Sequence, residues 1–144
     1  DRPARVSDGD DAPRGAGNSD GQVTPMERVN LASKLASFST HWDPKIVADL
    51  NGQQVKLVKF KGEFVWHHHE QEDEMFLVLE GSFAMEFRDR TVSLTEGEFI
   101  VVPRGIEHRP VAEEEAQVLL FEPATTLNTG NVRGERTVAE LQRL

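Results

Sequence analysis

Between Val55 and Phe121 the chain is a succession of short β-prone runs, and this feature limits the fold more than any other. Each run has five to seven residues rich in Val, Phe, Leu and Thr, and glycines, prolines or acidic residues separate it from the next. Strands this short and this closely spaced are typical of a sandwich or barrel rather than a βαβ fold. The runs expected to form strands are residues 54–60, 63–69, 74–80, 82–88, 91–95, 98–102 and 116–122.

The segments on either side of these runs have a different texture. Apolar residues at helical spacing predict a short N-terminal helix over 29–38 and a short C-terminal helix over 135–144. Residues 1–25 are rich in Asp, Gly, Pro and Arg and cannot bury enough surface to fold alone. We therefore expect a flexible or partner-contacting arm over residues 1–25 and a single domain over residues 26–144.

The charge balance excludes several classes of partner. The formal net charge is −9, which argues against nonspecific binding to nucleic acid or to an anionic membrane surface. No apolar run approaches the ~20 residues of a membrane span, and no signal peptide is recognisable. Cysteine is absent, so the chain has neither a disulfide nor a thiolate. These features favour a cytoplasmic location.

Three histidines and one glutamate have the spacing of a chelating group. Because side chains alternate between the faces of a strand, His67 and His69 are expected to point one way and His68 the other. Two Cα atoms at this spacing lie about 6.5 Å apart, close enough for both rings to bind one ion. An acidic turn then allows Glu74 to face the pair, and a Pro-x-Gly turn positions His108 on a distant strand.

Each of these pieces alone has an ordinary explanation, because surface histidines, satisfied core histidines and solvated acidic turns are common. Together they supply three neutral nitrogen donors and one anionic oxygen donor, which suits a divalent transition metal. The sequence therefore predicts a metal site at His67, His69, Glu74 and His108. The alternative is a structural barrel whose histidines bind no metal.

The spacing of these residues resembles the two motifs of the RmlC-like cupin superfamily, in particular its small bacterial single-domain members of the cupin 2 conserved-barrel type. The similar stretches are Gly62…His67-x-His69-x4-Glu74-x6-Gly81 and Gly97-x5-Pro103-x-Gly105-x2-His108, with fifteen residues between the two. Two positions depart from the family pattern. Four residues instead of five separate Gly62 from His67, and Ala112 stands where the second motif usually has Asn.

The resemblance implies an all-β fold, an antiparallel jelly roll or double-stranded β-barrel, with its core at about residues 52–122. It also implies a metal inside one end of the barrel, with His67, His69, Glu74 and His108 as the ligands. Cupins use Fe, Mn, Ni, Co, Cu or Zn. Three imidazoles and one carboxylate leave room for five or six ligands, which favours Fe or Mn over a structural Zn. No residues are predicted to bind a further cofactor.

Tyrosine is absent as well as cysteine, which excludes those chemistries of the superfamily that need a tyrosine acid or a Cys–Tyr crosslink. Weak catalytic candidates remain in Glu63 and Arg109. Glu63 shares strand parity with His67, so it is expected either to line the barrel or to be a solvated edge residue. Arg109 either holds a carboxylate substrate or pairs with an acidic neighbour. The other acid and base candidates are Glu72, Glu107 and His68.

An apolar cavity is expected beside the metal. Phe76 and Val78 share parity with Glu74, and Phe99 and Val101 are expected to share a wall with them. Such a lining suits a small apolar or aromatic ligand, although ordinary barrel core is the alternative. Because inward-facing Lys and Arg look scarce, a sugar phosphate is disfavoured.

The predicted function is that of a small metal-dependent enzyme, of the oxygenase, isomerase or decarboxylase type, acting on a small organic molecule. The alternative is a non-catalytic module that binds or senses a small molecule. A homodimer is expected, because short barrels expose strand edges that must be covered and the arm of residues 1–25 can add a strand to a partner.

Overall fold

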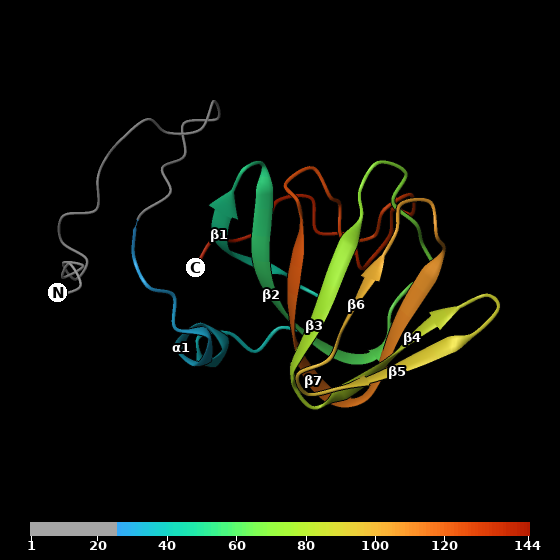
Figure 1. Ribbon diagram of the computed structural model, residues 1–144, viewed down its shortest axis with the longest axis horizontal. Coiled ribbons are helices and arrows are strands. Elements are labelled where there is room, and N and C mark those ends of the chain that lie inside the picture. The colour runs from blue at the N-terminus through green and yellow to red at the C-terminus, as the bar shows by residue number, and fades with distance from the viewer. Residues whose placement is uncertain (1–25) are drawn as a thin grey trace, which may run out of the picture.

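A computed structural model describes residues 26–144, and the predicted arm of residues 1–25 lies outside the described residues. The described chain is almost entirely antiparallel β-structure with one short helix (Figure 1). Its elements are α1 (Leu31–Ala36), β1 (Lys45–Leu50), β2 (Gln53–Glu63), β3 (Glu74–Glu80), β4 (Ser82–Phe87), β5 (Thr91–Thr95), β6 (Phe99–Val102) and β7 (His108–Pro123). The prediction of an all-β cupin-type jelly roll is confirmed.

The helix α1 lies within the predicted range 29–38 but has only six residues. The side chain of Asn30 caps its N-terminus by accepting a hydrogen bond from the backbone of Ser33 at 2.9 Å. Leu35 is its one buried residue, which attaches the helix to the domain. None of the described residues forms a helix that is long and apolar enough to cross a membrane.

Strand β7 organises the sheet. Its second half pairs with β2 on one side and β3 on the other, which gives the strand order β1-β2-β7-β3-β6. Its first half pairs with β4, the inner strand of the β4–β5 hairpin, so the sheet bends around one interior (Figure 1). Within the described residues the hydrogen-bond ladder does not close into a complete ring.

The inner face of the bent sheet forms the core. Phe60, Phe76 and Phe83 contact one another there with ring centroids 5.2 to 6.4 Å apart, and Met85 and Val118 are fully buried beside them. Strand alternation places Glu74 on the same inner face as Phe76, because the burial of β3 alternates along its length. The aromatic core and the predicted metal ligand Glu74 therefore share one interior.

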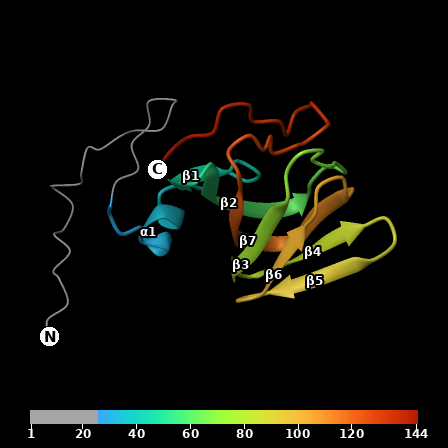
Figure 2. The same ribbon diagram turned by 45° about the horizontal axis from the view of Figure 1, so that its top comes forward.

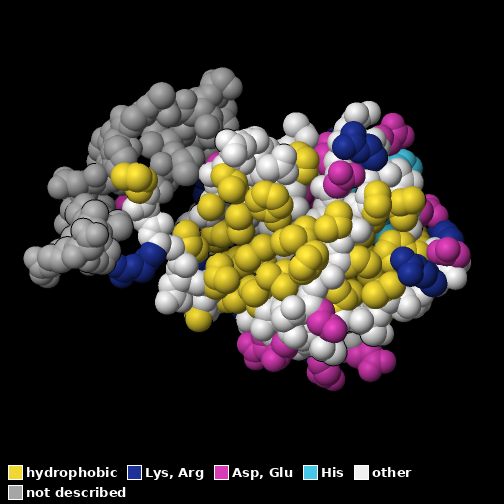
Figure 3. Space-filling view, viewed as in Figure 1, with side chains coloured by type: hydrophobic (Ala, Val, Ile, Leu, Met, Phe, Trp, Pro, Cys, Tyr) yellow, Lys and Arg dark blue, Asp and Glu magenta, His cyan; other side chains and the backbone are white. Residues whose placement is uncertain are grey.

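The outer face of the sheet is apolar as well (Figure 3). Phe99 is 62% exposed and Val101 is 50% exposed, and they pair in register with Leu77 and Met75. The expectation that Phe99 and Val101 line the interior with Phe76 is therefore wrong. Strand β6 has the opposite parity to the one assumed, and Val102 is its buried residue.

Three predicted elements need correction, and one strand was not predicted. Residues 63–69 form no continuous strand, and His67 makes only an isolated bridge to His108. Strand β1 was not expected, and β7 extends well before the predicted range 116–122. The C-terminal helix expected over 135–144 is wrong: that segment consists of turns and bends and ends in a bridge between Arg143 and Ile46.

Candidate metal centre

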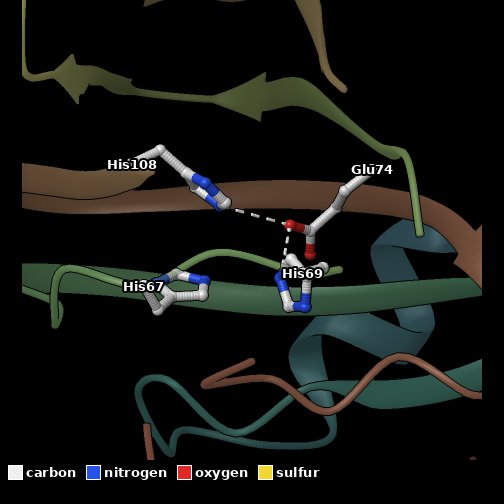
Figure 4. Close-up of side chains that lie close together, drawn as sticks. All are labelled: His67, His69, Glu74 and His108. Carbon is white, nitrogen blue, oxygen red and sulfur yellow. Dashed lines mark ion pairs between the residues drawn. The ribbon is translucent and has the colours of Figure 1, made fainter. Parts of the chain in front are cut away.

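The four predicted ligands come from three parts of the chain and meet inside one end of the bent sheet (Figure 4). His67 and His69 belong to the irregular segment after β2, Glu74 begins β3 and His108 begins β7. All four are buried, with exposed fractions between 0% and 4%. One donor atom from each lies within 4.8 Å of all the others, so the structure brings the four predicted residues together, and their role as metal ligands stays a prediction.

Backbone carbonyls orient two of the three rings. Nδ1 of His67 lies 2.9 Å from the carbonyl oxygen of Val65, and Nδ1 of His108 lies 2.8 Å from that of Ile106. A carbonyl oxygen can only accept, so each Nδ1 must carry the proton and donate it. In its neutral form, each ring then has on Nε2 a lone pair directed at the site. Such backbone acceptors are the usual orienting partners of metal-bound histidines.

The atoms that face one another lack hydrogen-bond partners. Oε1 of Glu74 lies 3.2 Å from Nε2 of His69 and 3.5 Å from Nε2 of His108, but none of these three atoms has a partner in hydrogen-bond geometry. Unpaired polar atoms are costly in a buried site. Metal–ligand bonds of about 2.0–2.2 Å hold donor atoms about 3 to 4 Å apart, so a single divalent ion fits this group with small side-chain movements.

The site also favours the protonation states that bind a metal. Burial lowers the pKa of His67 from 6.5 to about 4, and the neighbouring charge of His108 adds to the effect. Burial alone would raise the pKa of Glu74, but the polar contacts with His108 and His69 outweigh it and hold that pKa below its usual range. Near neutral pH the centre therefore presents a neutral imidazole at His67 and a carboxylate at Glu74.

A buried ion pair lies next to Glu74, and the sequence analysis missed it. Nζ of Lys56 lies 3.3 Å from Oε1 of Glu122, and both side chains are at most 3% exposed. Burial and the negative charge of Glu74 raise the pKa of Glu122 well above its usual range, and Lys56 only partly offsets this. The expectation that inward-facing cations are scarce is corrected by Lys56, although this cation is already paired. The sequence signal that could have predicted the burial of Lys56 is its alternation along the strand with Val58 and Phe60, which are buried.

A small aromatic-lined cavity of about 30 Å³, open in part to solvent, reaches the site. Trp42 forms one wall and stacks on Phe60 at 4.5 Å and on Phe64 at 4.8 Å between ring centroids. The indole NH of Trp42 donates to the carbonyl oxygen of Lys61, which fixes the ring. His67 and Glu74 are the only titratable side chains among the described residues that line this cavity.

The weak catalytic candidates lie elsewhere. The side chain of Glu63 is 67% exposed, so the expectation that it could line the barrel is corrected in favour of the solvated edge. Arg109 pairs with Glu86 at 2.6 Å and reaches Glu63 at 3.5 Å. Of the two roles expected for Arg109, the structure shows the pairing with an acidic neighbour. His68 points away from the centre, with Nε2 3.4 Å from a carboxylate oxygen of Glu70.

The remaining acidic candidates also have partners outside the centre. Glu72 accepts a hydrogen bond from Thr125 at 2.9 Å, and Glu107 pairs with Arg88. Both partners lie outside the metal group.

Comparison with known proteins identifies the same fold and region. The family model described as "Cupin domain" matches residues 54–122. The chain is 45% identical to a cupin-2 domain containing protein from Shewanella frigidimarina, with a TM-score of 0.65 over 66% of this chain and 93% of that one. It is 35% identical to protein NMB1881 from Neisseria meningitidis, with a TM-score of 0.63 over 68% of this chain and 100% of that one.

A curated relative gives the same sequence region. The uncharacterized protein YdbB of Bacillus subtilis is 39% identical over 80 residues, which is 55% of this chain. The match spans 65% of the length of that relative.

Proposed function

Because this chain belongs to the cupin family, we propose that it is a small metal-dependent enzyme acting on a small organic molecule. The observation that carries the proposal is the group of buried atoms on His69, Glu74 and His108 that lack hydrogen-bond partners, beside an aromatic cavity that Glu74 lines. A buried group of donors without partners is expensive unless a ligand satisfies it.

A bound divalent metal would supply Lewis-acid chemistry or hold a second reactant beside the substrate. The chain's own residues do the remaining work. His67 and His108 direct their Nε2 lone pairs inward because each Nδ1 proton is held by a backbone carbonyl. Glu74 adds a negative charge that lowers the net charge of the occupied site. Fe and Mn suit this donor set best, and Ni, Co, Cu and Zn are further candidates.

The cavity defines the substrate class that we propose. Its walls are mainly aromatic and aliphatic, with Trp42, Phe60, Phe64 and Phe76 on them, and this lining favours a compact and largely apolar molecule. The molecule's polar group would face His67 and Glu74. An oxygenase, isomerase or decarboxylase reaction agrees with such a site.

One observation favours the alternative of a binding or sensing module. The described lining residues include no titratable group beyond His67 and Glu74, and both are proposed ligands. The weak catalytic candidates lie outside the cavity, where Arg109 pairs with both Glu63 and Glu86. A reaction that needs a separate acid or base would therefore have to take it from the substrate or from bound water.

A homodimer remains part of the proposal, and the outer sheet face supports it. Two rows of paired residues without a charged side chain cross this face: Val55, Phe121, Met75 and Val101 in one row, and Leu119, Leu77 and Phe99 in the other. Large exposed apolar patches on soluble proteins mark interaction sites. Since the chain has a net charge of −9, two copies approach with least repulsion through an uncharged face.

Metal-loaded protein distinguishes the two functions. The protein is loaded anaerobically with Fe(II) or Mn(II), and oxygen uptake and substrate loss are followed across a panel of small aromatic and aliphatic acids, ketones and alcohols. Turnover that disappears in His108→Ala and persists in His68→Ala supports the enzyme. A compound that raises the melting temperature of loaded protein without being converted supports the binding module instead.

A further inference from the structure

The segment that carries His67 and His69 is held from two sides although it is not a regular strand. His67 exchanges two backbone hydrogen bonds with His108, at 3.1 and 2.9 Å, and the carbonyl oxygen of His69 accepts from the backbone of Gly105 at 2.7 Å. These contacts come from the second half of the family match. The middle residue, His68, faces the other way and is tied to a different part of the chain.

That part is the C-terminal segment after β7, residues 124–144 (Figure 2). The backbone of Asn131 donates to the carbonyl oxygen of His68 at 3.1 Å, and the backbone of His68 donates to Oδ1 of Asn131 at 2.8 Å. This reciprocal pair fixes both polar backbone groups of His68. The two flanking histidines are thereby held with their rings pointing into the site.

Gly130 makes the close approach of the two segments feasible. A Cβ atom at this position would lie 2.2 Å from the carbonyl oxygen of His68 and 3.2 Å from Cδ2 of the His67 ring. The φ angle of Gly130 is +54°, a region that residues with a side chain seldom adopt. Any larger residue here would push the His67 ring or the His68 backbone out of place.

The C-terminal segment is braced internally and is anchored at its far end. Thr129, which is 1% exposed, shares a hydrogen bond of 2.7 Å with the hydroxyl of Thr137. At the far end, the backbone NH of Ile46 donates to the carbonyl oxygen of Gln142 at 2.9 Å. The backbone NH of Leu144 donates to the carbonyl oxygen of Ile46 at 3.0 Å. The segment thus connects β1 with the side of the histidine segment on which His68 lies. It lies entirely outside the family match at residues 54–122.

We propose that Gly130 and Asn131 are positioning residues of the metal centre, which set the orientation of His67 and His69 through the backbone of His68. This inference rests on the metal site proposed above. According to this proposal, a segment outside the family match contributes to the metal affinity and the coordination geometry of the site. Partners that orient metal ligands typically change metal affinity by about 10–100-fold when they are removed.

Cobalt(II) tests the proposal, because its affinity and its visible absorption both report on the coordination sphere. Asn131→Ala removes the acceptor for His68, and we expect it to weaken Co(II) binding about 10-fold and to alter the visible spectrum of the bound ion. Asn131→Asp retains an acceptor oxygen and should restore both readouts to near the wild-type values. Gly130→Ala should weaken binding at least as much as Asn131→Ala.

Thr126→Val is the matched control in the same segment. The hydroxyl of Thr126, which is 7% exposed, donates to the carbonyl oxygen of Pro123 at 2.8 Å, and no hydrogen bond of the described residues joins it to the histidine segment. The variant should lower the melting temperature and leave the Co(II) spectrum unchanged, with affinity within about twofold of wild type.

The outcomes separate this inference from the proposed metal site. If the wild-type protein binds no Co(II), the metal site itself fails. If wild type binds and Asn131→Ala binds with unchanged affinity and spectrum, the positioning role is wrong. Equal losses of affinity in Asn131→Ala and Thr126→Val would show that the segment contributes only general stability, which also overturns it.

Discussion

The backbones of His67 and His108 donate hydrogen bonds to each other's carbonyl oxygens, and their imidazole rings lie 4.3 Å apart between centroids. This bridge joins the two motifs recognised in the sequence. It brings the start of β7 against the irregular segment after β2 and so turns two distant histidines toward one point. The backbone pairing of His67 and His108 thus contributes directly to the convergence of the four side chains.

The stability of the metal-free protein should depend on pH through His67. Its pKa is about 4 in the folded state and 6.5 in the unfolded state, so the unfolded chain takes up the proton first as the pH falls. The associated stability is fully present above pH 6.5 and is lost progressively toward pH 4. The shift is equivalent to about 3 kcal/mol in the free energy of unfolding.

Urea unfolding of chelator-treated protein at several pH values between 7 and 4 measures this loss. His67→Gln should show a shallower decline over the same range, because glutamine does not titrate. Identical pH profiles for the wild type and His67→Gln would contradict the assignment of His67 as a buried neutral imidazole.

The Lys56–Glu122 pair should behave as a unit. Glu122→Leu leaves Lys56 buried without its partner and is expected to reduce the free energy of unfolding by about 3–5 kcal/mol. The double variant Lys56→Met/Glu122→Leu replaces both groups with apolar side chains and should recover most of that loss. Chemical unfolding of the wild type, both single variants and the double variant gives the coupling. Additive losses in the double variant would show that the two residues act independently.

The outer sheet face should control the oligomeric state. Phe99→Lys places a charge at the β6 end of one uncharged row and should convert a dimer into a monomer of 16.1 kDa. Light scattering coupled to gel filtration measures the mass. Met26→Lys, at a position that is 68% exposed and outside the sheet, is the control and should leave the dimer intact. A wild-type protein that is already monomeric at micromolar concentration would refute the dimer.

The sequence predicted the metal group well because its spacing depends on local rules. Alternation placed the rings of His67 and His69 on one side, and this result holds although residues 63–69 form no strand, since extended backbone alternates with or without a ladder partner. His68 points outward for the same reason. The distant partner His108 came from the motif resemblance.

The errors arise where tertiary packing overrides a local pattern. Val138, Leu141 and Leu144 have helical spacing, but the segment instead bonds to the edge of β1 through Ile46. The acidic residues Glu113–Glu115 interrupt the apolar pattern of β7, so its first half was not recognised. The roles proposed for Gly130 and Asn131 depend on contact with a segment more than 60 residues away, for which the local sequence carries no signal.

The metal content of four proteins tests the central claim most directly. Wild type, His67→Ala, His108→Ala and His68→Ala are each equilibrated with Mn(II) or Co(II), freed of excess metal and analysed for bound ion by elemental analysis. We expect about one equivalent in the wild type and in His68→Ala, and less than about a tenth of an equivalent in the other two variants. Equal metal content in His67→Ala and His68→Ala, or no metal in the wild type, would contradict a centre built from His67, His69, Glu74 and His108.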